Sequence, residues 1–211
     1  MTRQIALVGL LLAGPSGCQF EPRGSAPPAD DPGAGSGPDG GAGSIGGDTA
    51  EMILAGPGQY HYDTSSGLLT GVDGQPIEHA SEVVEGTRVL STGSLLLAAG
   101  AVLRVEGSLP LRVDAASTIE LAGVLDAASS AEGDGAGAVP GDGLAGSSGG
   151  AIALIARARL QVSGRILVGG AGGVGGALSG TGGGGGRGGT ASLEAQRIVL
   201  ADGAVVNANG G

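Results

Sequence analysis

Between Leu95 and Gly211 one pattern of apolar and polar residues is written four times. Subtracting residue numbers shows that the pattern recurs after 16, then 41, then 39 residues. The copies begin at Leu95, Leu111, Ile152 and Ala191, and each contains a glycine, at Gly107, Gly123, Gly164 and Gly203. The pattern predicts a unit of 16 residues with glycine-rich insertions that, by difference, are 25 and 23 residues long and include roughly residues 128–150 and 169–189. A repeated unit of this kind is typical of a solenoid, in which stacked neighbours bury a continuous core.

The parity of the residues indicates extended chain. From Leu95 to Ala127 every odd position is apolar, glycine or serine, and the charges stand at even positions. Side chains of a strand alternate between two faces, whereas a helix would scatter these charges around its circumference. We therefore expect strands with an aliphatic interior and a charged exterior.

A shorter apolar repeat, at half the spacing of the predicted unit, is also compatible with an antiparallel meander, which stays open as an alternative. The link between Val113 and Ile119 lacks the Asn-Gly or Asp-Gly of tight hairpins, and rungs stacked one repeat unit apart would set Arg104 beside Glu120. These two features favour an all-β fold: a small single-chain parallel β-helix with glycine-rich loop insertions, preceded by a signal peptide and a disordered linker.

The first residues have the organisation of an export signal. Arg3 is followed by a short apolar run at 5–13 and then by Pro15-Ser16-Gly17-Cys18. This segment is similar to a bacterial lipoprotein signal, a resemblance that implies cleavage after residue 17 and lipidation of Cys18. An ordinary secretory signal with an incidental cysteine is the alternative. Cys18 is the only cysteine, so an intramolecular disulfide is excluded.

Composition divides the rest of the chain. Residues 18–50 are rich in Gly, Pro, Ala and Asp and predict a disordered tether. Residues 51–90 are interpreted as an irregular cap, and residues 91–211 as the β-helix. The last residues, Asn209-Gly210-Gly211, stand where earlier copies begin a loop. We expect either association through that end or a longer repeat protein.

Charge excludes one class of partner. The chain has ten Lys and Arg against twenty Asp and Glu, a net charge of −10. Because phosphate binding needs a basic face, nucleic acid is not expected as a partner.

Few residues suggest chemistry. The run Gly182–Gly186 lacks the Gly-Lys-Ser/Thr of a phosphate loop, and Asp134 and Asp142 lack the spacing of calcium-binding repeats, so no cofactor and no metal are expected. His61 with Asp63 is a weak candidate for ligand or acid–base chemistry, and His79 is interpreted as solvated. Arg157 and Arg159 share one strand face and suggest either a basic ledge for an acidic saccharide or plain solubility.

Residues 107–127, the glycine-rich loops and residues 149–156 resemble the glycine-rich β-helical surface proteins of environmental bacteria, often described as PGRS-like after the polymorphic GC-rich repeat sequences. The stretch Tyr62–Gly67 is similar to a segment that precedes the first rung in them. The resemblance covers about the last 150 residues. It implies a secreted or surface-attached protein without a known catalytic site.

These features lead to one expected function and two alternatives. We expect a lipid-anchored, extracytoplasmic protein of the bacterial outer membrane or cell surface that acts as a structural or adhesin-like interaction element. Its expected partners are the membrane, through the lipid on Cys18, and an envelope protein or polysaccharide. No enzyme activity is expected, because the outward residues form no dense group in the sequence. A β-helical polysaccharide-active enzyme and a fragment of a larger surface repeat protein are the alternatives.

Overall fold

The computed structural model describes residues 50–130, 133–141, 145–173 and 183–211. Cys18, the predicted signal peptide and nearly all of the predicted tether lie outside these residues, as does Asp142. The described residues are all β. The strands are β1 (Met52–Leu54), β2 (Gly58–Asp63), β3 (Leu68–Thr70), β4 (Ala80–Val84), β5 (Thr87–Thr92), β6 (Leu95–Leu97), β7 (Ala101–Glu106), β8 (Leu111–Ala115), β9 (Thr118–Leu121), β10 (Val124–Asp126), β11 (Ala151–Val162), β12 (Arg165–Leu167), β13 (Thr190–Leu200) and β14 (Val205–Asn207). No helix that could cross a membrane occurs in this part of the chain.

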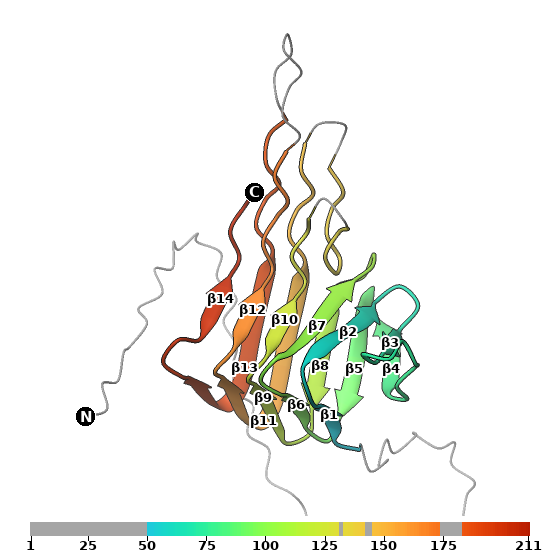
Figure 1. The fold of residues 1–211 in the computed structure, drawn as a ribbon, viewed down its shortest axis with the longest axis vertical. Coiled ribbons are helices and arrows are strands. Elements are labelled where there is room, and N and C mark those ends of the chain that lie inside the picture. Colours follow the sequence, from blue (N-terminus) through green and yellow to red (C-terminus); the bar gives the residue numbers. More distant parts are fainter. Residues whose placement is uncertain (1–49, 131–132, 142–144, 174–182) are drawn as a thin grey trace, which may run out of the picture. The chain divides into compact units, whose positions relative to one another are not determined.

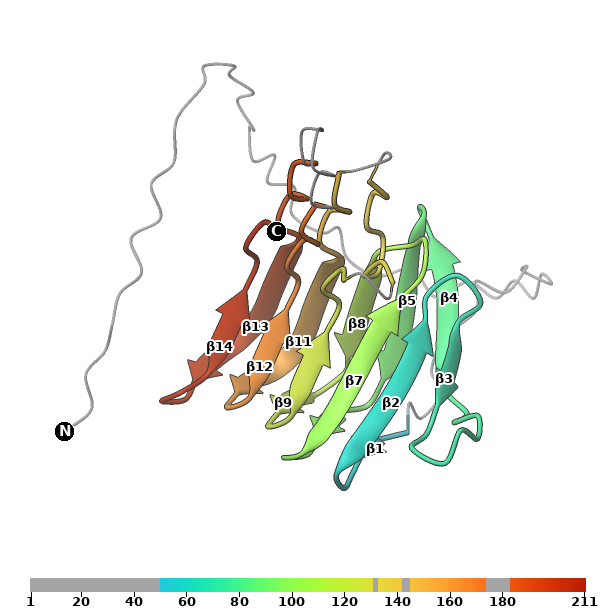
Figure 2. The ribbon, with the colours of Figure 1, turned by 45° about the horizontal axis from the view of Figure 1, so that its top comes forward.

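The strands stack in parallel and coil around one core (Figures 1 and 2). Four turns can be followed in the described residues: β5–β6–β7, β8–β9–β10, β11–β12 and β13–β14. Each strand pairs with its counterpart one turn away, so that β11, for example, lies between β13 and the pair β8 and β9. The predicted parallel β-helix is confirmed, and the antiparallel meander is wrong for these turns.

The predicted period is wrong for the first turns. Leu95 pairs with Ile119 instead of the expected Leu111, and Leu103 pairs with Leu125 instead of the expected Ile119. A turn therefore holds three short strand segments, not two. The shorter apolar repeat in the sequence corresponds to one strand segment, and each turn contains three copies of it. Consequently Gly107 lies at the corner between β7 and β8, not in the column of Gly123 and Gly164.

This register also separates the predicted charge pair. Arg104 lies beside His61 on one side and Asp126 on the other, whereas Glu120 lies beside Leu96 and Gln161. The expected Arg104–Glu120 neighbours are therefore wrong. The two residues stand on different faces of the coil, because the third strand segment of each turn intervenes.

The later repeats follow the predicted spacing more closely. Ile152 pairs with Leu111 and with Ala191, as the repeated pattern predicts. Beyond Ala195 the register shifts, and Leu160 pairs with Ile198 instead of the predicted Val199. A β-bulge at this point, where the strand bends from one limb of the coil to the next, takes up the difference.

Regular strands also occur in the segment interpreted as an irregular cap. β1 and β2 pair in parallel with β6 and β7 and add a partial turn. Two antiparallel hairpins follow, β2–β3 and β4–β5. The second turns through Glu85 and Gly86, which have φ values of 50° and 76°. Two positive φ angles in a two-residue loop are typical of the hairpin turn whose twist matches its strands.

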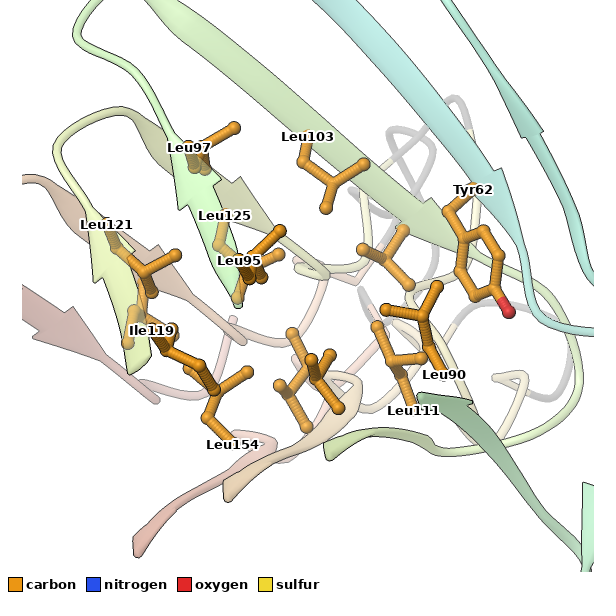
Figure 3. Packing of buried hydrophobic residues seen from close by; sticks show 14 of the residues in the cluster. Tyr62, Leu90, Leu95, Leu97, Leu103, Leu111, Ile119, Leu121, Leu125 and Leu154 are labelled. Carbon is orange, nitrogen blue, oxygen red and sulfur yellow. The ribbon is translucent and has the colours of Figure 1, made fainter. Parts of the chain in front are cut away.

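The core is a set of aliphatic columns (Figure 3). Leu97, Leu121 and Val162 succeed one another in adjacent strands and are 0%, 1% and 0% exposed. Leu103, Leu125 and Ile166 form a similar column on the other sheet. Each fully buried Leu, Ile or Val stabilises the fold by about 1.5–3 kcal/mol. The predicted parity is confirmed, since these inward residues keep the odd positions from Leu95 to Ala127.

The glycine-rich insertions lie between β10 and β11 and between β12 and β13. Their described residues are hydrogen-bonded side by side: Gly149 N–H donates to Arg187 O at 2.7 Å, Ala171 N–H to Ser147 O at 2.9 Å, and Gly186 N–H to Ala171 O at 2.7 Å. The C-terminal Gly211 N–H donates to Gly186 O at 2.9 Å. We call residues 145–150, 168–173, 183–189 and 208–211 the glycine bundle. In the described residues, these hydrogen bonds join the two insertions to each other and to the last residues of the chain.

Backbone proximity explains the glycines of this bundle. A Cβ atom at Gly186 would overlap the carbonyl oxygen of Ser147, and one at Gly149 would overlap that of Val168. At Gly184, by contrast, an added Cβ would meet nothing within 4 Å. Glycine is therefore required where one segment lies directly against another, and is replaceable elsewhere.

We predict that Gly186→Ala lowers the free energy of unfolding by about 1–3 kcal/mol, because the backbones must move apart to admit the methyl group. Gly184→Ala is the matched control and should change it by less than about 0.5 kcal/mol. Calorimetric melting temperatures, together with hydrogen exchange of the Gly149 and Ala171 amides, would measure both effects. Equal stability and equal exchange in the two variants would contradict the close packing.

Candidate functional site

A polar pocket of about 350 Å³ lies on the outer face of the sheet formed by β2, β7 and β10. We call it the polar pocket. Its lining residues are Gln59, His61, Arg104, Glu106, Asp126, Ala128 and Ser130. The strands place them together because Gln59 and His61 of β2 lie beside β7, and Arg104 of β7 lies beside Asp126 of β10.

Glu106 is the centre of the hydrogen-bond network. Its Oε2 atom lies 2.9 Å from Nε2 of His61, and its Oε1 atom accepts a hydrogen bond of 2.9 Å from Nε of Arg104. Both carboxylate oxygens are thus occupied. The side chain of Arg104 is 11% exposed, whereas that of His61 is 44% exposed and reaches solvent.

Arg104 also links the pocket to the next turn. Its terminal nitrogen lies 3.1 Å from Oδ1 of Asp126 and donates to the carbonyl oxygen of Ala128 at 2.7 Å. The same Oδ1 accepts the Ala128 N–H at 3.0 Å. A guanidinium between two carboxylates therefore joins β7 and β10, which lie in successive turns. A nearly buried charge of this kind needs such partners.

The environment of Glu106 favours its charged form. Partial burial by itself would raise the pKa of Glu106, but the hydrogen bonds from His61 and Arg104 and the positive charge of Arg104 outweigh it and hold the pKa below its usual value. Glu106 is thus an ionised acceptor at neutral pH. A general acid would need the opposite shift.

The polar pocket corrects the expectation that the outward residues form no dense group. His61, Arg104, Glu106 and Asp126 converge, and His61 pairs with Glu106 instead of Asp63. Asp63 accepts hydrogen bonds from the N–H of Ser65 and the hydroxyl of Ser66. These bonds outweigh the effect of burial, which alone would raise the pKa of Asp63, and lower it. Asp63 therefore serves the turn after β2.

The two tyrosines of β2 and the second histidine lie close to the core. Tyr60 and Tyr62 face the core and are 6% and 1% exposed, as the alternation predicts. His79 is only partly exposed, which corrects our interpretation: its ring packs edge-on to Tyr62 with centroids 5.5 Å apart, and Nδ1 lies 2.8 Å from Ile77 O. Burial raises the pKa of Tyr62 despite the opposing effects of the nearby Ser81 hydroxyl and the charge of Arg88.

The arginine pair lies at the bend of β11. Arg157 is exposed, while Arg159 is half-buried and donates to the side-chain oxygen of Gln161. Arg197 of β13 lies beside Arg159 in the ladder. Arg159 thus lies beside a third arginine, and none of these arginines lines the polar pocket.

The remaining candidates provide no metal or phosphate site in the described residues. No group of three or more His, Cys, Asp or Glu side chains there is placed to hold a metal ion. Asp134 lies in the first insertion, and Asp142 and Gly182 lie outside the described residues. The Gly186 amide, which a phosphate loop would direct at its ligand, donates to the backbone instead.

Comparison of the chain with protein-family models, with curated proteins and with solved structures gave no match. The polar pocket is therefore interpreted from its own geometry.

We predict that Glu106→Gln lowers the melting temperature at pH 7 and that the difference from the unchanged protein closes as the pH falls. A carboxyl whose pKa is lowered by folding contributes stability above its unfolded pKa, about 4.3 for Glu. That stability is lost as the pH falls through the folded value.

Calorimetry between pH 7 and pH 2.5 would measure the effect of Glu106→Gln. Glu120→Gln, an exposed carboxylate on β9 outside the polar pocket, controls for the loss of one negative charge. A difference that stays constant over the whole pH range would show that the charge of Glu106 is not what stabilises the fold.

Proposed function

We propose that the protein is a lipid-anchored cell-envelope protein whose β-solenoid acts as a structural or interaction element, with the polar pocket as a binding site for a polysaccharide. The observation that carries the binding role is the pairing within the pocket. Glu106 holds His61 and Arg104 in fixed positions, while Gln59 and His61 remain accessible to a ligand. Polar groups that are fixed before binding lose less conformational entropy when they bind.

The same pairing favours binding over acid–base catalysis. Glycoside hydrolysis needs one carboxyl that stays protonated and one that is charged. Glu106 has a lowered pKa and a hydrogen-bond partner on each oxygen, and Asp126 is bonded to Arg104 and to the Ala128 amide. Fixed hydroxyl-binding groups beside an ion-paired arginine are suited to a sugar chain that lies along the solenoid.

The anchoring part of the proposal rests on the N-terminal sequence. A short apolar run precedes Ser16-Gly17-Cys18, and no other cysteine occurs in the chain. A single cysteine cannot form an intramolecular disulfide, whereas lipidation would give Cys18 a function. More than one acyl chain on Cys18 would hold the protein stably at a membrane, where one chain gives reversible binding. We place the solenoid outside the cytoplasm, at the outer membrane or cell surface.

A polysaccharide-active enzyme is the second candidate, and one observation favours it. Three or more acidic and basic side chains converging in a groove is the arrangement that such an enzyme requires, and the polar pocket has four. The two candidates differ in their products, since a binding module leaves the polysaccharide chain intact.

We predict that the protein is labelled by palmitate in its native host and that Cys18→Ser abolishes the label. The label is expected because Cys18 is the residue at which the lipid would be attached. Membrane fractionation, with protease added to intact cells, would locate the labelled protein. Ser25→Ala, in the predicted tether, is the control and should keep the label. Release of unlabelled, soluble protein by wild-type cells would overturn the anchor.

We predict that the full mature chain binds an envelope polysaccharide without cleaving it. His61→Ala and Gln59→Ala should each weaken binding about three- to tenfold, because each removes a hydrogen-bonding group worth about 0.5–1.5 kcal/mol. Glu120→Gln, exposed on β9 and outside the pocket, should leave binding unchanged. Affinity electrophoresis over a polysaccharide panel would measure binding, and a reducing-end assay would detect cleavage. Cleavage that is lost in Glu106→Gln would favour the enzyme instead.

A further inference from the structure

The last turn of the solenoid has a neighbour on one side. Among the described strands, β13 pairs with β11 and β14 pairs with β12, and neither has a partner on its other edge. Figure 2 shows β13 and β14 together at one end of the stack. An unpaired strand edge presents backbone donors and acceptors on which another strand can add.

The inward side chains of this turn are uncovered. Leu160, Val162 and Ile166 of the third turn are each 0% exposed, because the fourth turn covers them. Their partners in the fourth turn, Ile198, Leu200 and Val206, are 44%, 57% and 45% exposed. The same positions that form the core elsewhere thus form an apolar surface here, which burial against a partner would stabilise.

The sequence of β13 is complementary to itself in the antiparallel direction. If Glu194 of one copy lies opposite Arg197 of a second copy, antiparallel pairing also places Arg197 of the first copy opposite Glu194 of the second. In this register Leu193 lies opposite Ile198, so that inward residues meet inward residues and outward residues meet outward ones. Any other register would break both charge pairs.

The bend in β13 supports the same register. The register shift between β11 and β13 falls at Gln196, which faces Arg157 and Ala158 of β11, and it marks the corner at which β13 passes from one side of the coil to the next. With Glu194 opposite Arg197, the bends of the two copies coincide at the two-fold axis. A two-fold axis there places the first half of one β13 against the second half of the other. It also places β14 of one copy against β14 of the other.

The charges on this edge belong to no ion pair within the described residues. Arg197 lies beside Arg159, a residue of like charge. The charge of Glu194 attracts the Arg112 guanidinium, but that guanidinium is already hydrogen-bonded to both oxygens of Asp114. The ion pairs of the described residues include neither Glu194 nor Arg197. A second copy would supply the opposite charge to each.

The glycine bundle leaves this end accessible. In Figure 1 its described parts extend along the strand direction, clear of the free edges of β13 and β14. A second solenoid can therefore approach the last turn without meeting them.

We propose that the β13–β14 end of the solenoid is an interface with a second copy of this chain. The two copies form a two-fold, end-to-end dimer in which β13 pairs antiparallel with β13, Glu194 opposite Arg197. A contact of this kind is closed, because the same surface is used on both copies and no strand edge at this end stays unpaired.

Charge reversal tests this register. The background is the full chain with Cys18→Ser, which removes both lipid and disulfide as causes of association. Glu194→Arg should place two arginines opposite two arginines, and Arg197→Glu two acids opposite two acids, so each variant by itself should raise the dimer dissociation constant about tenfold or more. An equimolar mixture of the two variants restores both opposite-charge pairs and should dimerise like the parent chain.

Sedimentation velocity over a concentration series would measure these dissociation constants, with circular dichroism to show that the variants are folded. Glu120→Arg, outward on β9 and away from this end, is the control and should leave the dimer unchanged. A parent chain that stays monomeric up to its solubility limit would overturn the proposal. So would a dimer that both variants leave intact, or one that the mixture fails to restore.

Discussion

The fold depends on the stacking of aliphatic side chains from one turn upon those of the next. A single turn cannot bury its own inward face, so Leu97 is covered because Leu121 and Val162 follow it in the ladder. The parallel backbone pairing and the inward parity both serve this arrangement. It also explains why the last turn, with Ile198, Leu200 and Val206 exposed, is the part of the molecule at which we propose a partner.

Charge on this solenoid is organised by the same stacking. Arg104 joins Asp126 and Glu106 because the register brings β7 beside β10, and a nearly buried guanidinium is tolerated when both carboxylates contact it. The polar pocket is therefore both a link between turns and a surface of fixed polar groups. A site that stabilises the fold in this way is suited to holding a ligand, since its side chains are already ordered.

The glycine bundle shows a second use of repetition. The insertions leave equivalent corners of successive turns, so the stacking of the strands brings the inserted segments side by side. Segments that lie this close have room for backbone and little else, and Gly186 is required for that reason while Gly184 is not. The high glycine content is thus a consequence of backbone packing at these positions.

The sequence by itself determined the all-β class, the inward and outward faces of the strands and the places of the insertions. These follow from the alternation of side chains in a strand, which is a local property. The tertiary structure decided the number of strands in a turn, and with it the partners of Arg104 and the convergence of His61, Glu106 and Asp126. The short apolar repeat is equally compatible with a turn of two strands and with a turn of three. The choice depends on where the chain bends and closes around the core, and contacts between residues far apart in sequence set that closure.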